Sequence, residues 1–459
     1  MQRHSTPEVP MKPGGNRWDW LEERRTFWLA LGLGTAARLA VALLLTDVGL
    51  FSDPLFYHRA AAGLAGGLGL DFYWPPVFPF YLSGFQLAFG DLATVSRLAM
   101  LPLWVGFALS GRGLVCELTD RRTANLFLIL FCFYPLFVIH SVEPFTQLPT
   151  ALCLIWVCRL AIRVVRDGDR GAMWGLGVLL GVTALLRSSS ILLVPAVPLL
   201  VGVLRREPSA AVRVALPALA IVGGWVLYAS LDTGTFVFIN YANAHNLFFG
   251  NNPYTPIYET GYFASRYEGD PGVPEAYSRL WNSIKALPAH LQDRACWRAV
   301  LAHVLDRPDL FLLRSLSRLR MYFAFPTDFG SILRSIYGAP APVWLACGGT
   351  DAAVYLGIAG TAITALFAGV GKRLGDKVLP IILTVAVVYA LPFFVSFGHP
   401  TYNTAIQPLM AVLGLAWLTD GDRLTQLREN PRRRRWLYVA LALFLLVQVE
   451  WLIFTLHSL

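Results

Sequence analysis

The hydrophobic positions of this chain form long runs without regular polar interruptions. Apolar stretches of about 20 residues recur along the whole length, and each can cross a hydrocarbon core roughly 30 Å thick as a helix. A soluble helical protein would show polar faces at helical period, and most of these runs have none. About eleven membrane spans are predicted, near residues 27–46, 95–117, 123–141, 146–163, 172–187, 189–204, 213–231, 343–370, 378–397, 402–418 and 436–456.

Composition leads to the same class of protein. Of the 459 residues, 56% are hydrophobic and only 15% are charged, whereas roughly a quarter of the residues of a soluble domain are charged. The net charge of +9 does not indicate a nucleic-acid partner, because the basic residues gather in short clusters between apolar runs, as the positive-inside rule expects. We therefore expect an all-α, polytopic membrane helical bundle surrounded by membrane lipids.

Charge bias also sets the topology. Arg24 and Arg25 precede the first span and place the N-terminus in the cytoplasm. Residues 76–90 are apolar enough to span, but a span there would put Arg121 and Arg122 outside and reverse every later loop. An interfacial helix in the first external loop keeps the chain consistent. The expected division is a cytoplasmic tail (1–26), a transmembrane core (27–231) with external loop 47–93, an external segment (232–340) and C-terminal spans (341–459).

This topology brings several polar residues to the external face, at the ends of different helices. Polar groups in a membrane protein gather where there is water or a partner. We therefore expect a cavity that opens to the outside near the outer leaflet. Its candidate residues are Asp53, Glu143, His245 and His399, together with His58, His140 and Arg187.

Two carboxylates are the candidate catalytic groups. Asp53 follows the first span on a segment that can lie along the interface, a place suited to removing a proton from a hydroxyl; alternatively, it caps the helix that follows. Glu143 follows a span end and could hold an acceptor hydroxyl, orient the base or ligate a metal, or it is a solvated helix terminus. With Glu143, histidines such as His245 could complete a divalent-metal site, although a lone histidine is more often packed and hydrogen-bonded.

Several short motifs follow one another along the chain in a fixed order. They are Asp53, Tyr57, a Gly-rich turn, Pro75-Pro76, an aromatic helix, Arg97, Ser141–Glu143, Leu186-Arg187 and Phe249–Pro253. This ordered set resembles the GT-C superfamily, within which the chain is most similar to bacterial relatives of protein O-mannosyltransferases and lipid A aminoarabinose transferases. Three departures concern donor and acceptor identity: Trp74 stands where a basic residue is common, Phe56 replaces an arginine, and His399–Tyr402 replaces a late Arg-Tyr motif.

The resemblance implies a GT-C fold with the catalytic carboxylate, here Asp53, in the first external loop. The donor would be a polyprenyl-phosphate sugar, transferred with inversion to a hydroxyl of a lipid, glycan or protein. One carboxylate suffices, because a phosphate leaving group needs no proton, in contrast to glycoside hydrolysis. The site would face the periplasm of a bacterial inner membrane.

A leaving phosphate needs cationic partners, and arginine contacts phosphate with paired donors. Arg187, Arg59 and Arg266 lie on the expected external side, although Arg59 could instead reach lipid headgroups. Tyr57, His58, His245 and His399 complete the candidate substrate-binding set. Residues 240–268, which include Asn251, are rich in Asn and Tyr and would form a lid or acceptor surface, or a plain turn-rich loop.

Three other functions compete with glycosyl transfer from a lipid monophosphate. A transporter or flippase would need ionisable residues on several mid-membrane helices, often in paired repeats. A polysaccharide polymerase or ligase would take its sugar from a lipid pyrophosphate. A non-catalytic assembly subunit would tolerate replacement of Asp53. Arg38 and Glu450, deep in the first and last spans, are expected to have structural partners.

Overall fold

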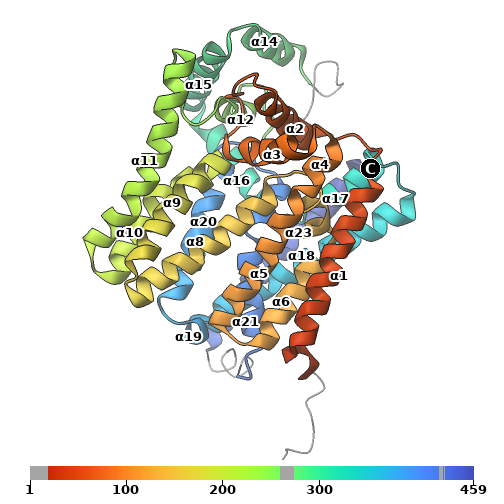
Figure 1. Cartoon of the computed structure of the whole chain (residues 1–459), viewed down its shortest axis with the longest axis vertical. Coiled ribbons are helices and arrows are strands. Elements are labelled where there is room, and N and C mark those ends of the chain that lie inside the picture. The colour runs from red at the N-terminus through yellow and green to blue at the C-terminus, as the bar shows by residue number, and fades with distance from the viewer. Residues whose placement is uncertain (1–18, 259–272, 423–426, 428–429, 459) are drawn as a thin grey trace, which may run out of the picture.

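In the computed structural model, helices and connecting loops account for the described residues, which are 19–258, 273–422, 427 and 430–458, and these ranges contain no strand (Figure 1). Eight helical stretches are long and apolar enough to cross a membrane, which confirms the all-α membrane bundle. They are α1 (Arg24–Leu44), α4 (Ala93–Leu98) with α5 (Met100–Leu118), α8 (Gln147–Asp167), η2 (Ser188–Leu192) with α10 (Leu193–Arg205), α11 (Pro208–Thr233), α18 (Ala341–Ala368), α20 (Val378–Val395) and α23 (Pro431–Ser458).

The other three predicted spans correspond to shorter helices. A proline at position 135 separates α6 (Arg121–Phe133) from α7 (Pro135–His140), since proline cannot continue a helix. The remaining two spans are α9 (Arg170–Leu186) and the pair η3 (Pro400–Ala405) and α21 (Gln407–Leu418). Every predicted span thus coincides with helix, and the count of eleven crossings stays a prediction.

Buried polar side chains satisfy the backbone at the break between α6 and α7. Arg38 of α1 donates to the carbonyls of Phe131 and Cys132 at 3.0 and 2.9 Å, and Asp351 of α18 accepts from the backbone N–H of Leu136 at 2.9 Å. Helix ends buried in a bundle need such partners, because no water reaches them. Arg38 therefore has the structural role expected from the sequence.

The loop predicted to be external, residues 47–93, is largely helical and lies on one end of the bundle (Figure 1). After α2 (Ser52–Ala65) the chain turns through Gly67 and Gly69, both with the positive φ that glycine adopts without strain. Pro75 and Pro76 then precede α3 (Val77–Phe89), which packs against α2. The apolar 76–90 segment is thus a helix of 13 residues, about 20 Å at 1.5 Å per residue and shorter than a span.

The long segment 232–340 is also largely helical in its described part. Around Phe248, Tyr277 and Cys296, three of its helices share a small hydrophobic cluster of their own. Its last two helices return to the bundle, where α16 packs on α20 and α17 on α18. The helices are α12 (Ala242–Gly250), α14 (Glu275–Lys285), α15 (Ala289–Asp306), α16 (Pro308–Tyr322) and α17 (Asp328–Ser335).

The predicted basic loops meet at the opposite end. Beside α19 (Gly371–Leu374), Arg373 forms an ion pair with Asp120 at 3.1 Å and donates to Thr419 Oγ1 at 3.0 Å. Arg205 donates to the carbonyl of Val164 at 2.8 Å. Figure 1 shows α19 at the bottom of the view and α2, α3 and α12 at the top. The loops predicted to be cytoplasmic and the loops predicted to be external thus lie at opposite ends of the bundle.

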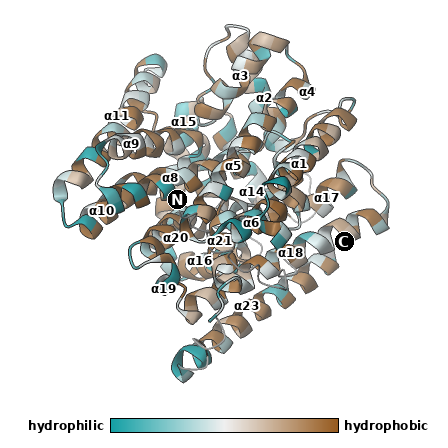
Figure 2. Ribbon diagram, turned by 60° about the horizontal axis from the view of Figure 1, so that its bottom comes forward, coloured by the Kyte–Doolittle hydropathy of each residue, from teal (hydrophilic) through white to brown (hydrophobic). Residues whose placement is uncertain are grey.

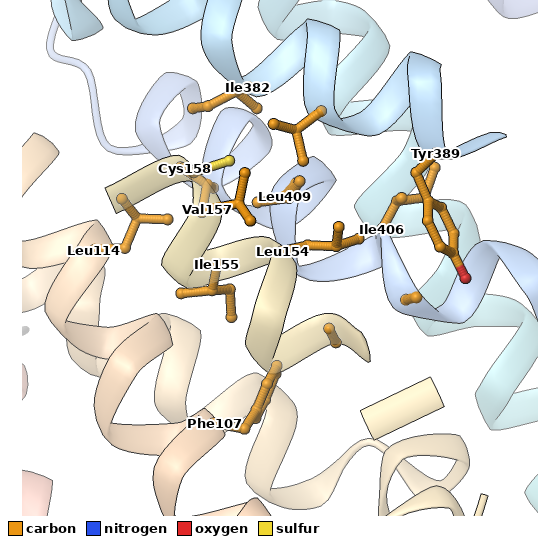
Figure 3. Packing of buried hydrophobic residues seen from close by; sticks show 14 of the residues in the cluster. Phe107, Leu114, Leu154, Ile155, Val157, Cys158, Ile382, Tyr389, Ile406 and Leu409 are labelled. Carbon is orange, nitrogen blue, oxygen red and sulfur yellow. The ribbon is translucent and has the colours of Figure 1, made fainter. Parts of the chain in front are cut away.

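The core of the bundle surrounds α8, of which two thirds is buried, whereas α23 is the span least covered by protein. Figure 3 shows side chains of α5, α8, α20 and α21, such as Phe107, Leu154 and Ile382, packed together. In Figure 2, α23 is brown along most of its length and teal at its N-terminal end, a pattern suited to a helix that faces lipid.

Candidate active site

The orientation of α2 separates the candidate residues of the first loop into two groups. Asp53 lies in the first turn of the helix, and Tyr57 follows four residues later on the same face. His58 and Arg59 point to other sides because each residue turns the helix by about 100°. Asp53 is half-buried, the Tyr57 side chain is buried and Arg59 is exposed.

Arg187, between α9 and η2, is close enough to Asp53 of α2 for its charge to act on that carboxylate. Its Nη1 donates to Thr146 Oγ1 at 2.9 Å, and its guanidinium carbon is 5.0 Å from the centroid of the Tyr402 ring. The Thr146 hydroxyl also forms a hydrogen bond with the Tyr57 side chain. Asp53 and Arg187 are within electrostatic reach of one another but do not form an ion pair.

The environment of Asp53 favours a proton-accepting role. Burial raises the pKa of its carboxyl, and the positive charge of Arg187 opposes that rise. Burial also raises the pKa of the Tyr57 hydroxyl, which therefore stays neutral and can donate a hydrogen bond. A carboxylate with a raised pKa and without a contacting cation retains basicity that an ion-paired carboxylate loses.

Glu143 has a different environment from Asp53. It is fully buried, its Oε1 accepts a hydrogen bond from Arg97 Nε at 2.9 Å, and Arg97 Nη2 forms an ion pair with the same oxygen at 2.9 Å. The Tyr337 hydroxyl donates to the same oxygen at 2.8 Å. Burial raises the pKa of Glu143, and Arg97 and Tyr337 oppose the rise. The alternative of a solvated helix terminus is wrong for this residue, since its exposed fraction is 0%.

His58 belongs to a polar network between α2, α3 and α4. Its Nδ1 lies 2.9 Å from Ser96 Oγ and 2.9 Å from Gln86 Nε2, and its Nε2 lies 3.1 Å from Asp91 Oδ1. Burial lowers the pKa of the ring, while Asp91 raises it. The network joins the three helices, and the charged groups that act on His58 are Asp91, Arg59 and Arg97 rather than Asp53.

His245 and Asn251 are buried at the two ends of α12. The His245 ring packs between Tyr73 and Trp281, with Nδ1 at 3.3 Å from the Tyr73 hydroxyl, and burial lowers its pKa to about 4. Asn251 donates to the carbonyl of Val395 at 2.8 Å and accepts from Arg318 at 2.9 Å. Its amide thus joins the external segment to the end of α20, which is a structural contact. Arg266 lies outside the described residues.

His399 lies near a carboxylate that the sequence reasoning missed. Its Nδ1 accepts from the backbone N–H of Thr401 at 3.3 Å and is 3.9 Å from Asp328 Oδ1, in the first turn of α17. His140 is buried, within electrostatic reach of both Asp328 and Arg187. The surroundings of Arg187 therefore include Asp53, Tyr57 and His140. The sequence pattern could not identify Asp328, because the neighbours of Asp328 come from α7 and from the loop before η3, which are distant in sequence.

Two buried arginines of α16 were also missed. Arg314 and Arg318, one helical turn apart, are 2% and 0% exposed. Arg318 donates to the carbonyl of Val395 at 3.0 Å, and Arg314 lies 2.8 Å from His303 Nε2. The sequence does carry a signal for this pair, because two arginines four residues apart share one helix face and stand among leucines. It does not show their partners, which are remote in sequence.

The candidate metal ligands do not come together. Within the part of the chain that the structure describes, no three His, Cys, Asp or Glu side chains are placed to hold a metal ion. Glu143 is engaged by Arg97, and His245 packs among aromatic rings on α12. The divalent-metal site considered from the sequence has no support in this geometry.

An apolar cavity of about 370 Å³ lies elsewhere, between α17, α18 and α23. Its lining includes Phe325, Trp344, Leu345 and Leu452. Thr327, which caps α17, and Gly330, Ser331 and Arg334 of that helix also line the cavity. Asp53, Asp328 and Arg187 are not among its lining residues.

No protein-family model and no curated protein sequence matches the chain. Among solved structures, the chain is similar to ArnT from Cupriavidus metallidurans bound to undecaprenyl phosphate, at 15% identity and a TM-score of 0.43, over 86% of this chain and 78% of that one. It is also similar to the oligosaccharyltransferase AglB from Archaeoglobus fulgidus, in complex with an inhibitory peptide and a dolichol-phosphate, at 14% identity and a TM-score of 0.46.

The second match covers 92% of this chain and 54% of AglB, so the chain spans about half the length of that protein. At these identities and TM-scores the two matches place no residue and no substrate on this chain, and the chemistry rests on the geometry of its own side chains.

Proposed function

We propose that this chain is a membrane glycosyltransferase of GT-C type that moves a sugar from a polyprenyl-phosphate donor to an acceptor hydroxyl. The observation that carries the proposal is the placement of Asp53 opposite Arg187. A half-buried carboxylate with a raised pKa faces a cation held by Thr146 and the Tyr402 ring, and the two do not neutralise each other by contact. A base and a phosphate-binding cation are the two groups that the reaction needs.

In the proposed reaction, Asp53 accepts the proton of the acceptor hydroxyl as its oxygen attacks the anomeric carbon. The new carbon–oxygen bond forms on the face opposite the phosphate, the bond from carbon to the phosphate oxygen breaks, and the configuration inverts. The phosphate leaves with the electron pair, and Arg187 stabilises its negative charge by charge-assisted hydrogen bonds. No group has to protonate this leaving group, so the site requires a single base.

The proposed orientation has the site at the external, periplasmic face of a bacterial inner membrane. The supporting observation is that the basic loops around Arg373 and Arg205 lie at the other end of the bundle. The acceptor is a hydroxyl of a lipid, glycan or protein. Nothing in the site favours one of these classes over another.

The structure gives the transporter alternative little support. The mid-span ionisable residues of the described chain have structural partners: Arg38 and Asp351 serve the break between α6 and α7, and Glu450 forms an ion pair with Arg320. A transport pathway would use such residues at a binding site between helices. The alternative of a polysaccharide polymerase or ligase differs from the proposed function in its donor, a lipid pyrophosphate, and the experiment below distinguishes the two.

The test uses the full chain in lipid nanodiscs, supplied with polyprenyl-phosphate mannose, other polyprenyl-phosphate sugars and polyprenyl-pyrophosphate sugars, with a membrane extract as acceptor source. Donor consumption is followed by mass spectrometry for the wild type, Asp53→Asn and the matched control Asp47→Asn, whose carboxylate is exposed in the same loop. We expect consumption of a monophosphate donor by the wild type and the control only. Consumption of pyrophosphate donors alone would favour a polymerase or ligase, and equal consumption by Asp53→Asn would remove Asp53 as the base.

A further inference from the structure

Glu143 lies in the turn before α8, where the first loop, α7 and α17 meet. We propose that Glu143 is a positioning residue which, through Arg97 and Tyr337, fixes the backbone that leads into Asp53. The expected effect of Glu143 on kcat rests on the proposed function. Its expected effect on the backbone of the loop can be measured without any activity. It replaces the catalytic role considered from the sequence with an indirect one.

The first step is the hydrogen bonding of Arg97, which is 0% exposed. Two of its nitrogens hold Glu143 Oε1, and Nη1 donates to the carbonyls of Leu45 and Val48, which follow α1. The Leu45 contact is 2.6 Å and the Val48 contact is 2.9 Å. Leu45 is the C-cap residue of α1, and its carbonyl also accepts from the backbone N–H of Val48 at 3.0 Å, while Val48 lies in the loop that follows. A charged donor that binds both carbonyls fixes the path of the loop between them.

The second step is the backbone just before Asp53. Ser52 has a φ of 48°, in the left-handed region that few non-glycine residues adopt. Such a conformation persists only where the surroundings determine it. The surroundings here are Arg97 on residues 45–48, the ring of Phe51 packed edge-on against Phe145 and Tyr337, and the hydrogen bond between Tyr57 and Thr146.

The third step is the link from Glu143 to α17. The Tyr337 hydroxyl donates to Glu143 Oε1 at 2.8 Å, and the Tyr337 ring contacts Phe51 at a centroid distance of 6.3 Å. Tyr337 follows the helix that begins at Asp328. One carboxylate oxygen therefore joins the end of α1, the residue before Ser52, and the helix that carries Asp328.

Burial excludes direct contact between Glu143 and a substrate in this arrangement. Oε1 accepts two hydrogen bonds and is also within 2.9 Å of Arg97 Nη2, and Oε2 is enclosed without a hydrogen-bond partner among the described residues. A proton acceptor for a substrate hydroxyl must come within hydrogen-bond distance of it. Asp53 is half-buried and can do so, whereas Glu143 acts through Arg97.

The experiment compares the wild type with Glu143→Gln, Tyr337→Phe and the matched control Glu117→Gln, which removes the charge from a partly exposed Arg159–Glu117 pair. Deuterium exchange of backbone amides is measured by mass spectrometry in nanodiscs. We expect Glu143→Gln to speed exchange in peptides covering residues 45–57 by about tenfold while α8 stays protected. Tyr337→Phe, which keeps the ion pair, gives a smaller increase, and the control gives none.

Kinetics on the donor that the wild type consumes provide the second measurement. A positioning role lowers kcat in Glu143→Gln, leaves KM for the donor within about twofold, and leaves the midpoint of the acidic pH limb unchanged. Loss of that limb with unchanged exchange would overturn the inference and make Glu143 a titrating catalytic group. Faster exchange throughout α8 and α20 in both Glu143→Gln and Tyr337→Phe would show a merely structural pair and also overturn it.

The two proposals fail in different ways. If Asp53→Asn consumes donor as fast as the wild type, the proposed base is wrong, but faster exchange at 45–57 in Glu143→Gln would still establish the contact between Glu143 and the loop. If exchange at 45–57 does not change in Glu143→Gln, the positioning role is wrong, whatever the result for Asp53.

Discussion

Asp53 and Glu143 are both carboxylates that follow a helix at the same end of the bundle, yet the structure gives them opposite surroundings. Asp53 is half-buried and faces Arg187 without an ion pair. Glu143 is sealed from solvent and held by Arg97 and Tyr337. The difference lies in the arginines. Arg97 contacts its carboxylate, whereas Arg187 is held by Thr146 and the Tyr402 ring.

The comparison separates a group poised to react from a group that fixes structure. A contacting cation stabilises the charged form of a carboxylate and weakens it as a base, while a cation held at a distance stays available for another anion. If this interpretation is correct, substitutions at the two sites should separate activity from stability.

The largest effect is expected for Asp53→Asn. Because a positioned general base contributes about 10²–10⁴-fold to rate, donor consumption in nanodiscs should fall by that factor. The thermal unfolding midpoint should stay within a few degrees of the wild type, since no ion pair is broken. Asp47→Asn controls for loss of a negative charge from the loop, and an equal loss of activity in that control would contradict the special role of Asp53.

Arg97→Met should have the converse effect on stability. Removing one partner of a buried ion pair leaves an uncompensated charge and costs about 3–5 kcal/mol. The unfolding midpoint, followed by intrinsic tryptophan fluorescence in detergent, should therefore drop far more than in Asp53→Asn. A midpoint equal to that of the wild type would mean that the Arg97–Glu143 pair contributes nothing to holding the loop.

An intermediate effect is expected for Arg187→Gln. The loss of a charge-assisted hydrogen bond to phosphate, about 1.5–3 kcal/mol, corresponds to roughly a 10–100-fold lower kcat/KM for the donor. The pH profile carries the sharper test. Arg187 lowers the pKa of Asp53 against the rise caused by burial, so its removal raises that pKa further.

Asp53 works as a base only when it is deprotonated, so activity falls as the pH drops through its pKa. In Arg187→Gln the acidic limb should therefore move to higher pH, when kcat/KM is measured between pH 4 and 8. A limb that stays in place or moves to lower pH would show that Arg187 does not act on Asp53.

The smallest effect is expected for His245→Asn. Burial lowers the pKa of this ring to about 4, so it is neutral throughout the range from pH 5 to 8 and cannot shape the pH profile there. The loss of ring packing with Tyr73 and Trp281 should lower stability by about 1 kcal/mol. A changed pH profile, or loss of activity that added zinc or manganese restores, would instead favour the metal role considered from the sequence.

The sequence predicted the spans well because long apolar runs are a local signal. It also predicted a structural role for Arg38. It could not assign Glu143 to Arg97 or reveal Asp328, because those environments depend on contacts between residues as distant as 97 and 143 or 328 and 399. Burial, rather than residue type, decides which carboxylate is reactive.

The buried position of Arg38 has a consequence for how the chain is made. Of its hydrogen-bond acceptors, only the carbonyl of Gly34 belongs to α1, whereas the carbonyls of Phe131 and Cys132 belong to α6 and are synthesised long after the first span has left the ribosome. Until then α1 carries a guanidinium without most of its partners, and an arginine weakens insertion of an isolated helix by about 2.5–3.5 kcal/mol at the membrane centre. The first helix is therefore expected to wait at the insertion machinery until α6 arrives, so that the two enter the lipid together.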